Sequence, residues 1–596
     1  MSLILSRRDI DFLLFELLDV EALLDRPRFR ELDRPTLDAV IDLAENLASD
    51  FFAPANKVAD QQEPTMTPGG HVRLPEETHV ALEAFRRSGL LAASHDRAVG
   101  GMQLPFVIDR AAFGWLQAAS PAIAGYALLT AAAANLLIEH GTADQIDSFA
   151  TPLLEGRHFG TMCLSEPQAG SSLGDIRTRA VRSADETYRL FGNKMWISGG
   201  DHSLTESITH LVLARVDGAP AGIKGLSLFI VPRDIDRGDG TTEHNDVVVA
   251  GLNHKMGQRG TVNALLNFGE GCYSPRGFPG AIGHLVGCEG DGLKVMFTMM
   301  NEARIGVGTS ATVIGYTGYL HAVDYARSRA QGRTSSQKDP TVQQVPIIEH
   351  ADVKRMLLTQ KAFVEGALAL NLYCARLVDE WRCSEGQEAE NIGLLLDLLT
   401  PVAKAWPSQY CLEANNLAIQ VHGGYGYTRD YNVEQFYRDN RLNPIHEGTN
   451  GIQAIDLLGR KVVIQDGRAL DIYTANVLAS CARAHDCGDE IAEHGGAVER
   501  MLKRIVSVTR GLHAAGDSEL LLSNAAIYLE VFGHLTIGWI WLEQILASHG
   551  KNGDFYEGKR AAARFFRRWE MVRAEASLGI IERLGRDFAD LRTEWL

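Results

Sequence analysis

The chain has 596 residues, 45% of them hydrophobic and 22% charged, and a formal net charge of −17. This length exceeds what one hydrophobic core supports and predicts roughly three or four structural units. The negative charge argues against a broad nucleic-acid-binding surface, although a local arginine cluster can still bind an anionic ligand.

The eight cysteines form no CxxC pair and show no zinc-finger spacing, so we expect reduced thiols, no metal site and a cytoplasmic protein. The N-terminus carries acidic residues after position 8 and lacks the apolar segment of a signal peptide. Near the C-terminus, the longest apolar stretch, 531–542, contains His534 and predicts a buried helix rather than a membrane span.

The first predicted region, residues 1–158, is an N-terminal helical domain with a short extension. In the segment 36–52 the apolar residues recur at the helical period, and Pro35 stands near its start. The segment 111–149 is rich in Ala and Leu and is also predicted to be helical.

The character of the chain changes in residues 159–288. Short strand-like runs at 209–216, 224–232 and 261–268 are separated by Gly, Pro, Asn and Asp. No helix-length pattern lies between these runs. The region therefore predicts an antiparallel β domain rather than βαβ units.

Two further helical regions follow, 289–462 and 463–596. The first is interrupted by a polar, proline-containing loop at 332–346, and the second has a weak break at 511–519 and a basic segment at 558–573. The predicted class is α+β: an N-terminal helical domain, a central antiparallel β domain, a C-terminal helical bundle and an extra C-terminal helical domain.

The segment 306–311, GVGTSA, fits a loose dinucleotide-binding pattern. That pattern requires a preceding strand, whereas the residues before it are predicted to be helical. Small residues on a closely packed helix explain the glycines, and we reject a nicotinamide-binding Rossmann domain.

Two segments of the β region carry candidate chemistry. The loop 162–176, MCLSEPQAGSSLGDI, can offer backbone N–H groups and hydroxyls to a polar ligand ring. The run 193–200, NKMWISGG, can supply a flat aromatic face beside a hydroxyl. Taken alone, the first segment looks the same as a surface turn, and a core tryptophan is the favoured interpretation of the second.

Three candidate segments lie in the following helical region. NEARIGVG (301–308) and YARSRAQGR (325–333) supply arginines that can pair with phosphates, although a solvated helix end looks the same. The Gly-Gly pair within 420–439 allows the backbone to approach a ligand closely, or simply ends a helix. In 443–460, Glu447 precedes Gly448 at a predicted helix start, where a carboxylate can point into a pocket or lie in solvent.

In chain order, SEP-x-AGS, K-x-WIS, R-x-Q-G, Q-x-HGG-x-GY and EGTN-x-IQ resemble the ordered motif set of the acyl-CoA dehydrogenase family, over about residues 35–460. The N-terminal extension, the loop 332–346 and the extra C-terminal helical domain resemble the family's long bacterial branch. That branch includes broad-range fatty acyl-CoA dehydrogenases and methylmercaptopropionyl-CoA dehydrogenases.

The resemblance implies an FAD enzyme that oxidises a fatty acyl-CoA to a trans-2-enoyl-CoA. Glu447 matches the catalytic base for the α-proton, while a hydride passes to flavin N5. Ser171 and Arg304 match positions that contact the CoA part of the substrate. The matched FAD contacts are Leu164, Ser165, Trp196, Ser198, Arg329, Gln331, Gln420, Gly423, Gly424 and Thr449.

The resemblance also implies an electron-transfer flavoprotein as acceptor, a homodimer or homotetramer, and a role in fatty-acid β-oxidation or related acyl-CoA catabolism. This chain departs from common family residues at Ser172, Gly451 and His446. His446 directly precedes the base; it can tune the pKa of Glu447 or shape the acyl pocket, and simple pocket lining is the plainer interpretation.

Two other functions stay open on sequence alone. An acyl-CoA oxidase would use FAD and the same base but reduce oxygen. A non-catalytic, flavin-bearing protein associated with DNA would use the basic segment 558–573, against which the net charge weighs. Neither the acyl chain length nor a methylthio substituent can be predicted from these motifs. The 463–596 region is expected to pack at a subunit interface or to rim the acyl and CoA entrance.

Overall fold

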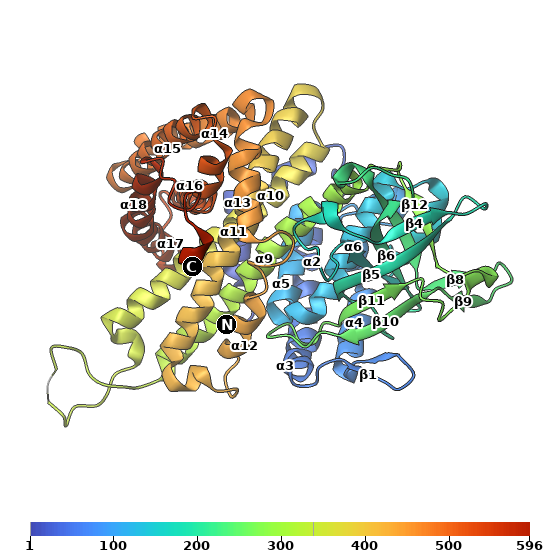
Figure 1. Ribbon diagram of the computed structural model, residues 1–596. Helices are drawn as coiled ribbons and strands as arrows, with labels where there is room; N and C mark the ends of the chain where they lie inside the picture. Colours follow the sequence, from blue (N-terminus) through green and yellow to red (C-terminus); the bar gives the residue numbers. More distant parts are fainter. Residues whose placement is uncertain (1, 338) are drawn as a thin grey trace. The chain divides into compact units, whose positions relative to one another are not determined.

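The computed structural model describes residues 2–337 and 339–596, with the side chains of 298–302 and 489 left out (Figure 1). The chain forms two compact units. Unit 1 comprises Met1–Asp38, Pro105–Gly114 and Arg304–Leu596, and unit 2 comprises Ala39–Leu104 and Trp115–Ala303. The division into domains 1–158, 159–288, 289–462 and 463–596 remains a proposal about evolutionary modules.

Three helices run through a unit boundary: α2 (Arg34–Leu47), α5 (Phe106–Ala119) and α9 (Gly292–Ser328). The other helices of unit 1 are α1 (Arg7–Asp11), α10 (Ala351–Arg382), α11 (Gly386–His422), α12 (Val433–Asn440), α13 (Asn450–Gly459), α14 (Arg468–His485), α15 (Asp489–Ala514), α16 (Ser518–Ala547), α17 (Asp554–Phe565) and α18 (Met571–Ile581).

The other helices of unit 2 are α3 (Ala53–Gln61), α4 (Glu76–Ser88), α6 (Pro121–His140), α7 (Ala143–Gln145) and α8 (Thr151–Leu154). Its strands are β1 (Thr65–Met66), β2 (Val72–Arg73), β3 (His158–Cys163), β4 (Arg179–Arg182), β5 (Tyr188–Ser198), β6 (Ser207–Val216), β7 (Leu226–Pro232), β8 (Asp234–Asp236), β9 (Thr242–His244), β10 (Val247–Leu252), β11 (Asn263–Phe268) and β12 (Ala281–Val286).

The main sheet of unit 2 has the strand order β10-β11-β5-β12-β7-β6-β3, and β4 pairs with both β5 and β6. Most neighbours are antiparallel, which confirms the predicted β domain. However, β3 and β4 each pair with β6 in parallel, a mixture that the sequence analysis did not predict. A parallel pair needs a long connection, and the loop and strands between β3 and β6 supply it.

Helix α6 packs directly on β3. The Gly160 N–H donates to the Thr130 hydroxyl at 3.0 Å, and a Cβ at Gly160 would lie 2.7 Å from the Ala133 Cβ. This contact fixes the strand that leads into the candidate loop at 162–176.

In unit 1, small residues let α9 and α11 pack closely. A Cβ added at Gly308 would lie 1.9 Å from the Ala403 carbonyl oxygen, and one at Gly315 would lie 2.8 Å from the Cys411 Cβ. The helix is continuous through 306–311, which confirms the interpretation of GVGTSA as a packing surface and excludes the strand that a Rossmann motif requires.

A buried ionic cluster joins the C-terminal helices to the rest of unit 1. Lys559 on α17 pairs with Asp9 on α1 and lies 2.9 Å from the Glu365 carboxylate on α10. Its ammonium also donates to Gln544 on α16 at 3.0 Å. Tyr316 on α9 donates to Asp9 at 3.0 Å. Since an unpaired buried charge is very costly, these contacts tie the five helices together.

Two described helices are long and apolar enough to cross a membrane, Pro121–His140 (α6) and Ser518–Ala547 (α16). In each, 67% of the apolar window is buried inside the protein, which is typical of core helices. The apolar stretch 531–542 therefore lies in a longer helix than the sequence analysis expected, and it is buried as predicted.

Candidate active site

Glu447 lies in a strained turn between α12 and α13. Its φ is 51° and that of Gly448 is 84°, so two consecutive residues adopt the left-handed region. Thr449 then caps α13, its hydroxyl accepting the Ile452 N–H at 3.3 Å. A non-glycine residue is rarely held at positive φ unless the surrounding structure enforces it, and such strain gathers at functional sites.

Two fully buried side chains hold the main chain of this turn. Gln453 donates to the Glu447 carbonyl at 3.0 Å, and the Lys404 ammonium donates to the Gly448 carbonyl at 2.8 Å. Within the described ranges, the Glu447 N–H donates to no carbonyl or side chain. The turn is therefore anchored through its carbonyls, while one N–H remains available to a ligand.

The Glu447 carboxyl is set for proton transfer. Burial raises its pKa to about 7, and the positive charges of Lys404 and Arg304 only partly offset this effect. Its Oε2 atom is buried and accepts no hydrogen bond within the described ranges. A carboxylate with a pKa near neutrality and an open oxygen matches the requirements of a general base.

Lys404, on α11, is a site residue that the sequence analysis missed. Burial lowers its pKa, the Glu447 charge partly offsets this and the Arg304 charge adds to it, with a net pKa of about 7. The available signal was a lysine within the apolar helical stretch 398–406, LLTPVAKAW. A buried charge in such a stretch needs a specific partner.

Arg304 is also buried near this turn. It is 3% exposed, and its guanidinium lies 3.0 Å from the Asp456 carboxylate on α13. The structure thus assigns it an intramolecular ion pair, and its contact with CoA remains a prediction.

The loop that follows α11 is open to solvent. Gly423 has a φ of 62°, and a Cβ at Gly423 or Gly424 would meet no heavy atom within 4 Å. The Arg329 guanidinium lies 5.5 Å from the Tyr425 ring centroid, so two predicted cofactor segments meet here. Gln331 and Gln420 are exposed near these segments, which suits contact with a large ligand.

In unit 2, Trp196 is 59% exposed with a φ of 66°. The β5–β11 register shifts there: two β5 residues oppose one β11 residue, which is a β-bulge. The bulge turns the indole outward, so a core role for Trp196 is wrong. Ser198, two residues later, is half-buried.

The loop after β3 is fastened beside β5. Lys194 donates to the Leu164 carbonyl at 2.8 Å, and the Met195 N–H donates to the Ser165 carbonyl at 2.9 Å. Lys194 also pairs with the buried Glu166 carboxylate at 3.0 Å. Two of the predicted motifs are thereby placed side by side, while Ser171 lies exposed farther along the loop.

In unit 2, the outward Trp196 ring offers a flat face that suits a planar ring. In unit 1, the open Gly423–Gly424 backbone permits close approach of a ligand, and Arg329 suits a phosphate. Each unit thus carries features that fit part of a planar cofactor with phosphates.

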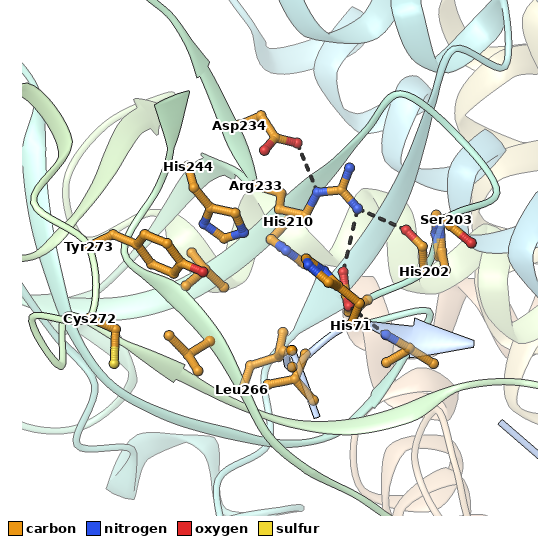
Figure 2. A pocket seen from close by; sticks show the side chains of 18 of the residues that line it. His71, His202, Ser203, His210, Arg233, Asp234, His244, Leu266, Cys272 and Tyr273 are labelled. Atoms are coloured by element: carbon orange, nitrogen blue, oxygen red, sulfur yellow. Dashed lines mark hydrogen bonds and ion pairs between the residues drawn. The ribbon is translucent and has the colours of Figure 1, made fainter. Parts of the chain in front are cut away.

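A separate cavity of about 520 Å³ lies within unit 2 (Figure 2). Figure 2 shows Arg233 beside Asp234, with His202, His210 and His244 around it. None of the predicted site residues lines this cavity. In the described part of the chain, no group of three or more potential ligands is placed to hold a metal.

Three family models match the chain. They are described as the acyl-CoA dehydrogenase middle domain at residues 161–269, the acyl-CoA dehydrogenase C-terminal domain at 290–462, and an acetyl-CoA dehydrogenase C-terminal-like domain at 473–592.

Curated relatives match over almost the whole chain. A 3-methylmercaptopropionyl-CoA dehydrogenase of Ruegeria pomeroyi is 34% identical, covering 92% of each chain. A broad-specificity linear acyl-CoA dehydrogenase of Mycobacterium tuberculosis is 35% identical, covering 98% of each. The crystal structure of a Bacillus anthracis acyl-CoA dehydrogenase complexed with FAD shares the fold, with a TM-score of 0.67, 18% identity, and coverage of 98% of this chain and 99% of that one.

Proposed function

Because the chain belongs to the acyl-CoA dehydrogenase family, we propose that it oxidises the Cα–Cβ bond of an acyl-CoA thioester to a trans-2-enoyl-CoA, with Glu447 as the base. The observation that carries this proposal is the Glu447 turn: an open, buried carboxyl oxygen and a pKa of about 7. A base with that pKa is half ionised near neutral pH, where proton abstraction is most effective.

FAD is the cofactor that the family uses, and the exposed aromatic face, the open glycine backbone and the arginine fit it. We propose that Leu164, Ser165, Trp196 and Ser198 hold the flavin ring, and that a second set binds the rest of the cofactor. That set is Arg329, Gln331, Gln420, Gly423, Gly424 and Thr449. When bound, FAD supplies the acceptor for the β-hydride.

The protein's own groups provide the acid–base chemistry. Glu447 removes the α-proton onto its carboxylate oxygen. Negative charge then develops on the thioester carbonyl oxygen, and the Glu447 N–H is a donor that can stabilise it. Lys404 and Gln453 keep that backbone in place by holding the two carbonyls of the turn. When the acyl chain excludes water from the site, these interactions become stronger, because their surroundings become less polar.

Ser171 and Arg304 are proposed to contact the CoA portion. We further propose an electron-transfer flavoprotein as acceptor, a homodimer or homotetramer, a cytoplasmic location and a role in fatty-acid β-oxidation or related catabolism. Two substrate classes are suggested by the relatives, methylthio-substituted and linear acyl-CoA thioesters.

A DNA-binding role is not favoured by the structure. In the basic segment, Arg564 pairs with Glu490, Arg567 with Glu493 at 2.7 Å, and Arg573 with Glu570 at 3.0 Å, while Lys559 is buried in its cluster. Cations already neutralised by carboxylates release few phosphate counterions on contact with DNA.

The deciding experiment is anaerobic bleaching of the bound flavin by butyryl-, octanoyl-, palmitoyl- and methylmercaptopropionyl-CoA. Wild type and Glu557→Gln, a control at an exposed carboxylate, should bleach; Glu447→Gln should bleach about 10²–10⁴-fold more slowly. A protein that binds FAD but is bleached by none of these thioesters would contradict the proposal. Rapid reoxidation by oxygen alone would instead identify an acyl-CoA oxidase.

A further inference from the structure

A chain of buried amides leads through unit 1 to the residue that precedes the base. Asn415, on α11, donates to the Ile314 carbonyl of α9 at 3.1 Å. Asn440, at the end of α12, donates to the Ala311 carbonyl at 3.0 Å and to the Asn415 side-chain oxygen at 2.7 Å. Both asparagines are fully buried.

The series of hydrogen-bonded amides continues toward the Glu447 turn. Asn443, also fully buried, donates to the Asn440 side-chain oxygen at 2.8 Å. The oxygen of Asn443 then faces the His446 Nε2 atom at 3.1 Å. Four polar side chains thus form one series of hydrogen bonds, all pointing the same way, that begins at the carbonyls of α9 and ends at His446, the residue before Glu447.

The direction of this series of hydrogen bonds determines the form of His446. The two α9 carbonyls can only accept hydrogen bonds, so the amide nitrogens of Asn415 and Asn440 must face them. Each side-chain oxygen therefore faces the next donor in turn. At the end, the Asn443 oxygen requires a donor, which makes His446 Nε2 the protonated nitrogen and leaves a lone pair on Nδ1.

We propose that His446 is a positioning residue, held by the asparagine chain as the neutral Nε2–H tautomer so that the side chain preceding Glu447 is fixed in orientation and uncharged. An amide acceptor supports this form, because a neutral oxygen does little to stabilise an imidazolium, whereas a carboxylate there would favour it.

The charges around the ring agree with neutrality. Lys404 on α11 lies near both His446 and Glu447, and Arg304 on α9 and Asp456 on α13 form an ion pair near the same turn. Burial, together with the Lys404 charge, lowers the pKa of His446 to about 3, so the ring stays uncharged at neutral pH. A positive charge at position 446 would lower the pKa of Glu447 and so oppose the effect of burial, which raises it.

This inference rests on the proposed function for its kinetic consequence, but its structural core can be tested apart from catalysis. In ¹⁵N-histidine-labelled holoprotein, the signal that disappears in His446→Gln should be that of a neutral Nε2–H imidazole. It should not titrate between about pH 5 and pH 9. An Nδ1–H tautomer, or titration near pH 6.5 as for an ordinary histidine, would overturn the proposal even if the enzyme were fully active.

The kinetic arm compares two variants of His446 with wild type in anaerobic flavin reduction. His446→Gln keeps a donor for Asn443 and should reduce flavin within about threefold of wild type, with an unchanged pH profile. His446→Phe keeps a ring without the donor and should lose about tenfold or more, because Asn443 is left unpaired. Equal rates and profiles for these two variants would show a pocket-lining residue only.

Asn443→Asp is the sharpest variant. A carboxylate at 443 gives up the hydrogen bond to the Asn440 oxygen but still faces the His446 Nε2 atom, where it should charge the imidazole; that charge should lower the acid limb of the rate–pH profile by about one pH unit. Asn416→Asp, at the exposed amide next to Asn415, is the matched control and should leave the limb in place. An unshifted limb in Asn443→Asp, with the imidazole shown by ¹⁵N signals to be charged, would refute the electrostatic role of His446.

Discussion

Two buried lysine–glutamate arrangements, one in each unit, show how the same residue types serve opposite purposes. In unit 2, the Glu166 carboxylate accepts hydrogen bonds from Lys194, from the Thr178 hydroxyl and from two backbone N–H groups, those of Arg177 and Thr178. In unit 1, Lys404 bonds a backbone carbonyl next to Glu447, and the Glu447 Oε2 atom stays open.

The consequence is a difference in proton affinity. For Glu166, burial alone would raise the pKa, but Lys194 and the hydrogen bonds outweigh it and lower the pKa to about 2. For Glu447, burial prevails and raises the pKa to about 7. Burial is thus common to both carboxyls. The number of hydrogen bonds to each decides whether its pKa is lowered, as in a structural ion pair, or raised, as the proposed base requires.

Removing Lys194, the cation paired with Glu166, should have the largest effect on stability. Lys194→Met leaves Glu166 buried without its cation and frees the Leu164 carbonyl, so we expect a loss of roughly 3–5 kcal/mol in stability. Chemical denaturation, monitored by flavin release and circular dichroism, measures it. A change below about 1 kcal/mol would mean that the other hydrogen bonds suffice for Glu166.

Opposite pH dependences of stability should follow from the two glutamates. The folded pKa of Glu166 lies below the usual 4.5, so its charged form stabilises the fold above that pH and this contribution is lost as the pH falls toward 2. The folded pKa of Glu447 lies above 4.5, so its carboxyl costs stability increasingly as the pH rises from 4.5 through about 7.

At pH 8, Glu447→Gln should therefore be more stable than wild type by up to roughly 3 kcal/mol and melt at a higher temperature. Glu166→Gln should be less stable by a similar amount and melt at a lower temperature. Near pH 4 the gain from Glu447→Gln should vanish. A destabilised Glu447→Gln at pH 8 would show that the carboxylate is stabilised by contacts beyond those described.

A change in the geometry of the open turn should cost rate. In Gly448→Ala the new Cβ would lie 2.6 Å from the Gln453 Nε2 atom, at a φ of 84° that disfavours alanine. We expect Gln453 to release the Glu447 carbonyl and flavin reduction to slow by about tenfold to a hundredfold. Gly451→Ala is the matched control, since its Cβ would meet only the Thr449 hydroxyl at 3.7 Å. Equal rates in the two variants would mean that Gln453 does not position the base.

The smallest expected effect is electrostatic. Lys404→Met removes a positive charge that lowers the pKa of Glu447, so the acid limb of the flavin-reduction profile should move up by about one pH unit. Activity should fall about tenfold below the limb, where less base is ionised; above it, any loss reports the missing bond to the Gly448 carbonyl. An unmoved limb would show that Lys404 acts only through its bond to the Gly448 carbonyl.

The candidate site shows where sequence interpretation succeeds. The ordered motifs selected Glu447, Trp196 and Arg329, and the structure places Glu447 in a turn at positive φ, Trp196 on a β-bulge and Arg329 beside Tyr425. The α–β–α order and the helix through 306–311 also followed from local periodicity, because apolar spacing along a helix or strand depends on near neighbours alone.

Contacts between separate helices and strands could not be predicted from local sequence patterns. Lys404, Gln453 and the asparagine chain act on the turn from other helices or from the next turn, and only packing brings them there. Arg304 was matched to a ligand contact, whereas the fold gives it Asp456 as a buried partner. The bulge that exposes Trp196 depends on the register of β11, which is set far along the chain.

The amino-acid sequence by itself therefore determined the family, the order of the elements and the choice of Glu447 as the proposed base, since these depend on local pattern and motif order. Only the tertiary structure decided that the pKa of Glu447 is raised and that of Glu166 is lowered, because a carboxyl's proton affinity is set by the burial and hydrogen bonds that distant segments impose on it.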